Sequence, residues 1–439
     1  MPMINLAPEL IGVLGICLML LLLMLRVPIG ISLGLVSFFG IWAMIGMRAA
    51  FGAIAEIPYD FTAHWSLSSI PMFLLMGYIA DRAGLIAGLF RLARLWLSWL
   101  PGGLGIASIA TAGMFSAATG SSLAASAALA RMATPEMLKY GYNPGLASGI
   151  AASAGTLGSL IPPSILLILY GVYVGVPISH LFIAGLSAGL ISIAVSAAVV
   201  MIRAIVTPTI APAPPKEETA LREKFVALMD VWPLILLIGG VLGGLFAGVF
   251  TATEAGAVGA VLALVIGVLK RTMTWEKFRQ AVSDTIYTTS AIFVVAIGAA
   301  LMTRFVALSG MPAALSNLVT GLVSDEIQLV LLIAPVLIIL GLFLDAIGML
   351  LIILPILLPV LLALDANLIW FGIIMIKFIE IGLVTPPVGL NVYVVKGVVG
   401  NTIPTHVIFK GIVWFIIADL IVIAILLIYP GAVLAWLPN

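Results

Sequence analysis

Apolar runs long enough to cross a lipid bilayer recur along this chain from Leu10 to its last residues. A bilayer core about 30 Å thick requires roughly 20 apolar residues for each helical crossing. Only 8% of the 439 residues are charged, whereas a water-soluble domain usually has about a quarter of its residues charged. Because lipid offers no partners to backbone polar groups, these features predict an all-α polytopic membrane protein.

The sequence gives no support for an enzyme, a nucleic-acid-binding protein or a disulfide-stabilised fold. It contains no HExxH motif, no GxxxxGK[ST] motif and no nucleophile with a nearby base, so neither intramembrane proteolysis nor ATP hydrolysis is expected. The formal charge of +1 provides no basic surface, and Cys17 is the single cysteine. The three histidines, His64, His180 and His406, lack metal-ligand spacing, so no transition metal and no cofactor is predicted. Nothing before Arg26 is positively charged, so we expect the first apolar run to remain as a membrane helix.

A segment of linker composition divides the chain into two halves. It is rich in proline and then charged at helical spacing. A shift of 224 positions aligns the halves without a gap, pairing Pro135 with Pro359, Gly158 with Gly382, and Pro162-Pro163 with Pro386-Pro387. Internal duplication explains this alignment. We therefore expect a first repeat over 1–203, a cytoplasmic linker over 204–230 and a second repeat over 231–439.

Basic residues in short loops indicate the orientation, because Lys and Arg favour the cytoplasmic side of a membrane. Glu56 and Asp60 precede one apolar run and Arg82 follows it, so that helix is expected to run from outside to inside. Counting crossings from this helix places both termini in the periplasm, although Arg48 and Arg304 fall on the opposite side. Each half then crosses about five times, and an odd number inverts the second half relative to the first.

Each half also has a segment that begins and ends on one side of the membrane. Residues 101–134 contain the small, polar stretch FSAATGSSLAAS, which is typical of a re-entrant hairpin buried in protein. The corresponding hairpin is expected over 325–358, with Asp345 at its tip. The proline pairs remove backbone donors and predict broken helices over 144–175 and 367–400.

Broken helices in a membrane expose backbone carbonyls and helix ends. Carbonyl oxygens with Ser and Thr hydroxyls are suitable ligands for a small cation, whereas the positive N-terminal ends of half-helices suit an anion. These features occur at residues 120–122, 154–164 and 380–391 and at Asp345. The sequence therefore predicts a coupled transporter site, formed twice and driven by an ion gradient.

Structural explanations compete with this interpretation. A Gly-Ser pair such as that at Ser121 often serves only close helix packing, and proline pairs can merely kink a helix. The repetition of the proline pair at the equivalent position favours function. Lys377 and Glu380, three positions apart, are equally consistent with a plain intrahelical ion pair. Glu254 and Asp419 are expected to be interfacial anchors near helix ends.

Three stretches of the sequence resemble the large permease subunit of the tripartite ATP-independent periplasmic (TRAP) transporters. They are residues 120–171, from GSSLAAS to IPPSILLILYG, then GLFLDAIGMLLIILPILLP and EIGLVTPPVGLNVYVV in the second half. The resemblance covers nearly the whole chain. It implies a fold of the ion-transporter superfamily, with a scaffold domain and an elevator-type moving domain. It also implies sodium-coupled uptake of a carboxylate, such as a C4-dicarboxylate, or a sulfonate in the bacterial inner membrane.

The same resemblance implies partners and site residues. A periplasmic binding protein would deliver the substrate, and a small four-helix membrane subunit, which we do not expect in this chain, would complete the transporter. The first sodium site would comprise Gly120, Ser121, Ser122, Gly155, Thr156 and Pro162. The second would comprise Asp345, Gly382, Thr385 and Pro386. The substrate would lie between them, bordered by Ser122, Ser164, Gly389 and Asn391.

Two other hypotheses remain open. A stand-alone sodium or proton symporter or antiporter of the same superfamily would need no binding protein. A non-transport membrane scaffold would have no reason to repeat broken helices.

Overall fold

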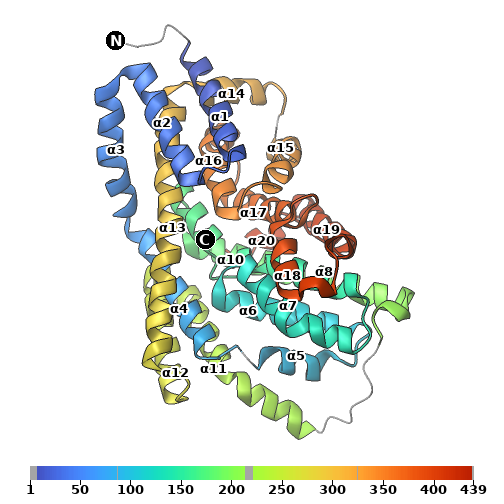
Figure 1. Ribbon diagram of the computed structural model, residues 1–439. Helices are drawn as coiled ribbons and strands as arrows, with labels where there is room; N and C mark the ends of the chain where they lie inside the picture. The colour runs from blue at the N-terminus through green and yellow to red at the C-terminus, as the bar shows by residue number, and fades with distance from the viewer. Residues whose placement is uncertain (1–6, 87, 213–220, 324, 438–439) are drawn as a thin grey trace.

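The structure, a computed structural model, describes residues 7–86, 88–212, 221–323 and 325–437, and within these ranges it contains helices and no β-strand. The described residues of the first half form ten α-helices and three short 3₁₀ helices (Figure 1). They are α1 (Pro8–Met24), α2 (Ile29–Ile45), α3 (Met47–Thr62), η1 (Trp65–Ser68), α4 (Ser69–Arg82), α5 (Leu89–Leu97), α6 (Gly103–Thr119), α7 (Ser122–Lys139), α8 (Pro144–Ala154), η2 (Gly155–Ser159), α9 (Ile165–Val174), α10 (Ile178–Val206) and η3 (Pro208–Ile210).

The second half is described from α11, which begins at Leu221, inside the segment 204–230 that was expected to be a linker. Its helices are α11 (Leu221–Phe246), α12 (Ala252–Leu269), α13 (Trp275–Leu308), α14 (Met311–Thr320), α15 (Glu326–Gly341), α16 (Ala346–Ala363), α17 (Leu368–Val384), α18 (Leu390–Val399), η4 (Gly400–Thr402), α19 (Thr405–Ile428) and α20 (Gly431–Leu434).

The helices of the two halves follow the same register. The bounds of α16 are those of α7 shifted by 224 positions, and the same shift takes Pro144, which begins α8, to Leu368, which begins α17. It also brings α2, α6 and α10 onto α12, α15 and α19 to within three residues at each end. The main difference is that η1 separates α3 from α4, whereas the matching residues of the second half form the continuous helix α13.

Six helices in the described ranges are long and apolar enough to cross a membrane. They are α10, α11, α12, α13, α16 and α19, and several shorter apolar helices accompany them. Their lengths match the roughly 20 residues that a crossing requires. The structure thus confirms the predicted all-α polytopic fold.

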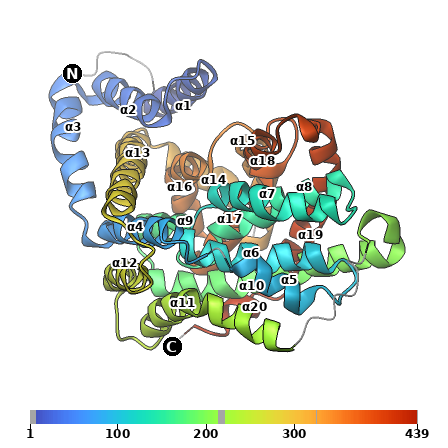
Figure 2. The ribbon, with the colours of Figure 1, turned by 60° about the horizontal axis from the view of Figure 1, so that its bottom comes forward.

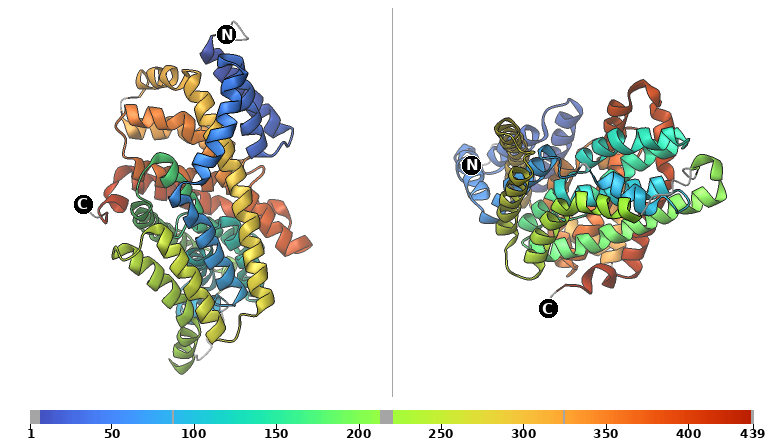
Figure 3. Two further views of the ribbon diagram at one scale, coloured as in Figure 1. Left: turned by 90° about the vertical axis from the view of Figure 1, so that its left-hand side faces the viewer. Right: turned by 90° about the horizontal axis from the view of Figure 1, so that it is seen from below.

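The helices gather in two groups that lie side by side (Figures 1 and 2). In the first group, α2 and α3 pack on α13, and α4 packs between α12 and α13. Glycines allow this close approach, since a Cβ atom at Gly298 of α13 would lie 2.6 Å from the Gly30 carbonyl oxygen of α2. The left panel of Figure 3 shows the length of α13, in yellow, beside the blue helices of this group.

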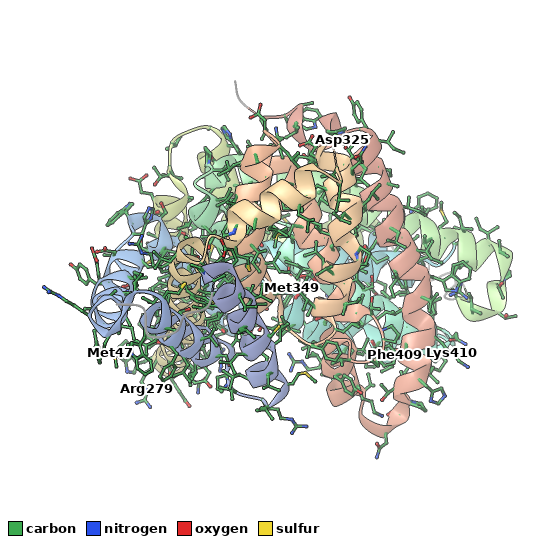
Figure 4. All side chains as sticks on the ribbon, turned by 90° about the horizontal axis from the view of Figure 1, so that it is seen from above. Met47, Arg279, Asp325, Met349, Phe409 and Lys410 are labelled. Carbon is green, nitrogen blue, oxygen red and sulfur yellow. The ribbon has the colours of Figure 1, made fainter. Side chains whose placement is uncertain are left out.

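The second group contains both hairpins and both helix breaks. It comprises α6 to α10 and α15 to α19, and α8 and α19 make its closest crossing. A Cβ atom at Gly411 of α19 would overlap the carbonyl oxygen of Gly145 of α8, so the two backbones are in direct contact. Figure 4, seen from above, places the buried Met349 of α16 near the middle of the molecule, whereas Met47 and Arg279 lie at its edge.

Candidate ion and substrate site

The tip of the first hairpin lies between α6 and α7. Gly120 has a φ of 61°, a left-handed conformation that favours glycine. A Cβ atom there would also collide with the carbonyl oxygen of Pro163. Ser121 then caps α7, because its hydroxyl accepts a hydrogen bond from the Ala124 amide at 3.4 Å. The tip is therefore fixed against the break between α8 and α9.

That break consists of η2, a bend and the Pro162-Pro163 cis peptide bond. It touches the tip again at Gly158, where a Cβ atom would lie 2.6 Å from the Ser121 carbonyl carbon. The Thr156 hydroxyl donates to the Ser153 carbonyl oxygen at 2.7 Å. A hydroxyl that donates its hydrogen in this way retains oxygen lone pairs that can bind a cation.

Two further residues predicted for the first half are also fixed by contacts. A Cβ atom at Gly155 would collide with the hydroxyl of Ser126, so the predicted sodium ligand Gly155 packs against α7. The Ser164 hydroxyl donates to the Ser159 carbonyl oxygen at 2.6 Å, and it caps α9 by accepting from the Leu167 amide at 3.4 Å. The bend is thus held by its own side chains.

The second hairpin reaches its tip between α15 and α16. Asp345 caps α16, and its carboxylate accepts hydrogen bonds from the amides of Ile347 at 3.2 Å and Gly348 at 3.3 Å. Just before the tip, Gly341 contacts α17, since a Cβ atom there would lie 2.8 Å from the Gly382 Cα atom. Gly382, predicted as a sodium ligand, therefore packs against the end of α15.

The second break separates α17 from α18 and contains the Pro386-Pro387 cis peptide bond. The Thr385 hydroxyl donates to the Ile381 carbonyl oxygen at 2.6 Å, and Gly389 precedes α18 with a φ of 59°. Asn391 is fully buried and donates to the Ala152 carbonyl oxygen of the first half at 3.4 Å. Its side-chain oxygen has no hydrogen-bond partner among the described residues.

Both tips and both breaks meet at a cavity of about 90 Å³, here named the central cavity. It brings together the predicted residues Gly120, Ser121, Ser122 and Asp345. Its other lining residues are Leu123, Ser159, Ile165, Leu166, Ala346, Ile347, Leu383 and Leu390. The predicted residues Gly155, Thr156, Pro162, Ser164, Gly382, Thr385, Pro386, Gly389 and Asn391 belong to the surrounding breaks rather than to the cavity lining.

Four helices begin at the central cavity. Their first residues, Ser122 of α7, Ile165 of α9, Ala346 of α16 and Leu390 of α18, all line it. Each helix N-terminus carries partial positive charge, and the caps Ser121, Ser164 and Asp345 already accept hydrogen bonds from first-turn amides of α7, α9 and α16. The convergence of four such ends creates a region suited to an anion.

A second cavity of about 280 Å³, here named the interface cavity, lies between the two helix groups. One wall comes from α4 and α13, including Tyr78, Asp81 and Thr288, and the other comes from the first hairpin, including Ser121 and Arg131. The Tyr78 and Thr288 hydroxyls are hydrogen-bonded at 2.8 Å. Ser121 lines both cavities, so the two adjoin.

The sequence did not assign Asp81, Arg131 or Ser159 to a site. In the sequence, Arg131 indicated only the cytoplasmic side of the membrane. Its place in the wall of the interface cavity depends on helix packing. A signal existed for Ser159, which lies between Gly158 and the proline pair in a stretch that was predicted to unwind. Nothing in the local sequence distinguishes Asp81 from a charge that ends a membrane helix.

The buried charges correct two interpretations from the sequence. Lys377 pairs with Asp419 of α19, at 2.5 Å between Nζ and Oδ1, and not with Glu380 on its own helix. Asp419 lies inside α19 and is buried, so its interpretation as an interfacial anchor near a helix end was wrong. Glu254 does lie at a helix start, where it forms a capping box with Thr251.

Comparison with known proteins identifies the family of this chain. The model described as "Tripartite ATP-independent periplasmic transporter, DctM component" matches residues 16–432. The C4-dicarboxylate TRAP transporter large permease protein DctM of Pseudomonas aeruginosa is 33% identical over 383 residues, covering 87% of this chain and 88% of that protein. The sialic acid TRAP transporter large permease protein SiaM of Vibrio cholerae is 30% identical over 368 residues, covering 84% and 85% of the two chains.

A solved structure supports the fold independently. The crystal structure of the Alcanivorax borkumensis YdaH transporter aligns with a TM-score of 0.63 at 16% sequence identity, covering 88% of this chain and 89% of that one. The family match spans both hairpins, both breaks and both cavities. On this evidence the chain is a multi-pass membrane transport protein and not an enzyme, and it belongs to the DctM component family of the tripartite ATP-independent periplasmic transporters.

Proposed function

We propose that the chain imports a small organic anion together with sodium ions by an elevator movement of its hairpin-containing helix group. Membership of the family makes it a subunit of a secondary transporter for organic acids that works with a periplasmic binding protein. Sodium coupling, the elevator movement and the class of substrate are the parts added by the proposal.

The convergence of four helix N-termini on the central cavity carries the proposal for the substrate. The described lining contains no fixed cation and includes the carboxylate of Asp345, so an anion would be held here by the four helix ends once a coupling cation neutralises Asp345. The two relatives described above are named for a C4-dicarboxylate and for sialic acid. Both are carboxylates, so we assign a carboxylate as the substrate class.

Hydroxyl and carbonyl oxygens around the two tips support sodium as the coupling ion. The described residues offer hydroxyls from Ser121, Ser122, Thr156 and Thr385 and a carboxylate from Asp345. Sodium is a hard cation that such oxygen ligands suit. Transport driven by a sodium gradient also fits a chain without a nucleotide-binding motif.

The position of the interface cavity supports the elevator movement. It lies where α4 and α13 meet the first hairpin, so movement of one helix group past the other would open or close it. Arg131 of α7 would meet the substrate carboxylate on this path, because guanidinium groups bind carboxylates with two parallel hydrogen bonds.

Reconstituted proteoliposomes test the proposal. Large subunit, small four-helix membrane subunit and binding protein should take up one or more acids from a panel of carboxylates and sulfonates when sodium is outside. Potassium alone should not support uptake. Uptake that needs no binding protein would favour the stand-alone symporter or antiporter, and uptake on a proton gradient without sodium would exclude the two sodium sites.

Two substitutions of Arg131 distinguish a role in substrate binding from an effect on folding. Arg131→Gln should raise the KM for substrate about tenfold, which corresponds to about 1.4 kcal/mol, while Arg131→Lys should recover part of the loss. Arg91→Gln is a matched control, because Arg91 faces Asp230 at an exposed position at 3.7 Å. Equal KM values for Arg131→Gln and the control would remove Arg131 from the substrate path.

A further inference from the structure

Among the described residues, the fully buried carboxylate of Glu380 has no ion-pair partner of its own. Lys377 and Asp419 form a buried pair with side chains 1% and 3% exposed, and this pair is neutral. Glu380 lies one helical turn after Lys377 and is 0% exposed. Among the described residues neither oxygen of Glu380 has a hydrogen-bond partner. An ionised carboxylate buried in this way is costly unless a cation accompanies it.

Glu380 lies near the first hairpin and the first break. The hydroxyls of Ser122 and Ser159 lie beside its carboxyl group, although neither is placed to donate a hydrogen bond of ordinary geometry. Both serines line the central cavity. The charged groups that act on Glu380 are Lys377 on its own helix and Asp419 on α19. Of the helices packed against α17, α9 and α16 contain no charged residue, whereas α10, α15, α18 and α19 also carry Arg203, Glu326, Lys396 and Lys410, respectively.

The register between the halves explains why a carboxylate is needed there. The shift of 224 positions pairs Ser121 with Asp345 and Thr156 with Glu380. At both positions the first half has a hydroxyl and the second half has an acid. A cation held by the first tip and the first break therefore obtains no formal negative charge from its own half.

We infer that Glu380 supplies the negative charge for the cation bound at the first hairpin tip, next to the hydroxyl oxygens of Ser122 and Ser159. This inference rests on the proposed sodium coupling and adds a residue of the second half to the first site. Since Lys377 and Asp419 cancel each other, Glu380 contributes a charge of −1 to the first site, and the carboxylate of Asp345 at the second tip lines the same cavity. The low dielectric of the core strengthens the attraction.

Sodium-dependent stabilisation of the purified full-length chain tests this assignment without any transport measurement. Sodium that binds only the folded protein stabilises it by RT ln(1 + [Na⁺]/Kd). A titration of the unfolding temperature at constant ionic strength, with choline as the replacement, therefore gives Kd, the half-saturating sodium concentration, when it is fitted to this relation. Glu380→Gln should raise this concentration at least tenfold, and Glu380→Asp should lie between wild type and Glu380→Gln. Glu254→Gln is the matched control, because Glu254 is exposed to solvent and caps α12. It should keep the wild-type value.

The outcomes distinguish a failure of the proposed sodium coupling from a failure of the Glu380 assignment alone. Wild-type protein that sodium does not stabilise would overturn sodium coupling itself, and the assignment of Glu380 with it. Wild-type protein that responds to sodium while Glu380→Gln responds with the same half-saturating concentration would overturn the assignment of Glu380 alone. If Glu380→Gln does not elute as a single peak on gel filtration, the Glu380→Asp variant tests the assignment instead. Aspartate keeps the negative charge but holds it one methylene group farther from the cation. An unchanged value in that variant would count against the assignment.

Discussion

The two helix breaks share a glycine and a proline pair in register, Gly158 with Gly382 and Pro162-Pro163 with Pro386-Pro387, but they have different surroundings. Both contain a cis proline pair, and each is followed by a short half-helix. Every residue from 151 to 170 around the first break is buried, whereas Pro386 and Pro387 of the second break are exposed. The first break is covered by its hairpin tip through Gly120 and Gly158, while the second hairpin contacts α17 at Gly382, before the break begins. Packing of the tips, not the proline motif, therefore decides which break is closed in this conformation.

The largest expected effect concerns the tip that covers the first break. Gly120→Val should reduce uptake about a hundredfold, or roughly 2.7 kcal/mol, because valine disfavours the left-handed conformation and its side chain would collide with Pro163. Leu344→Val, at the equivalent position of the second tip, should leave uptake within about twofold of wild type. Rates should be normalised to protein that elutes as a folded species. Comparable losses in both variants would show that the two tips have the same role.

Reaction with a small water-soluble maleimide measures the difference in exposure directly. In a Cys17→Ser background, which removes the single native and exposed thiol, Val388→Cys should react more than about tenfold faster than Ser164→Cys. The two positions are equivalent under the shift of 224, but Ser164 is fully buried and Val388 is only partly so. Local opening that costs about 1.4 kcal/mol is enough to slow labelling tenfold. Equal rates would mean that both breaks are equally accessible in solution.

Asp345→Asn should raise the half-saturating sodium concentration for uptake about tenfold, since it removes a charge worth at least ~1.4 kcal/mol to a nearby cation. Asparagine caps helices as well as aspartate does, so folding of α16 should be preserved. At the equivalent first tip, Ser121→Ala removes no charge and should change the sodium dependence only about threefold. The comparison fails if Ser121→Ala has the larger effect.

The smallest effects are expected for the remaining hydroxyls of the first site. Ser122→Ala and Thr156→Ala should each weaken sodium activation a few-fold while reducing stability by only about 0.6 kcal/mol, the typical value of a hydrogen bond in a membrane helix. Sodium titrations of uptake, together with unfolding temperatures without sodium, distinguish the two effects. If both variants lose stability but keep the sodium dependence, these hydroxyls serve packing only.

The local features of the site were accessible from the sequence because proline and glycine act on their own backbone. Pro162-Pro163 and Pro386-Pro387 interrupt helices at the expected positions, and Asp345 and Ser121 begin the helices that follow the two tips. The repeat offset placed these features in register without any knowledge of their contacts.

Contacts between distant helices were not accessible in the same way. Lys377 and Asp419 are 42 positions apart on different helices, and their pairing depends on how α17 and α19 are rotated about their axes. The position of Glu380 beside Ser122 and Ser159 likewise depends on how the second half packs against the first hairpin. A single sequence contains no signal for such rotations, since apolar residues lie on nearly all sides of α17 and α19.

The glycine crossing of α8 and α19 bears on energetic efficiency. Gly145 and Gly411 bring the backbones of the two halves into direct contact near the start of α8, with no side chain between them that could change rotamer. Rigid backbone contact of this kind opposes sliding of one half along the other. The ions and the substrate would therefore cross the membrane in a single stroke of one body. In the proposed cycle, dissipation of the sodium gradient through a half-completed stroke would require this contact to separate, so the contact would oppose slippage.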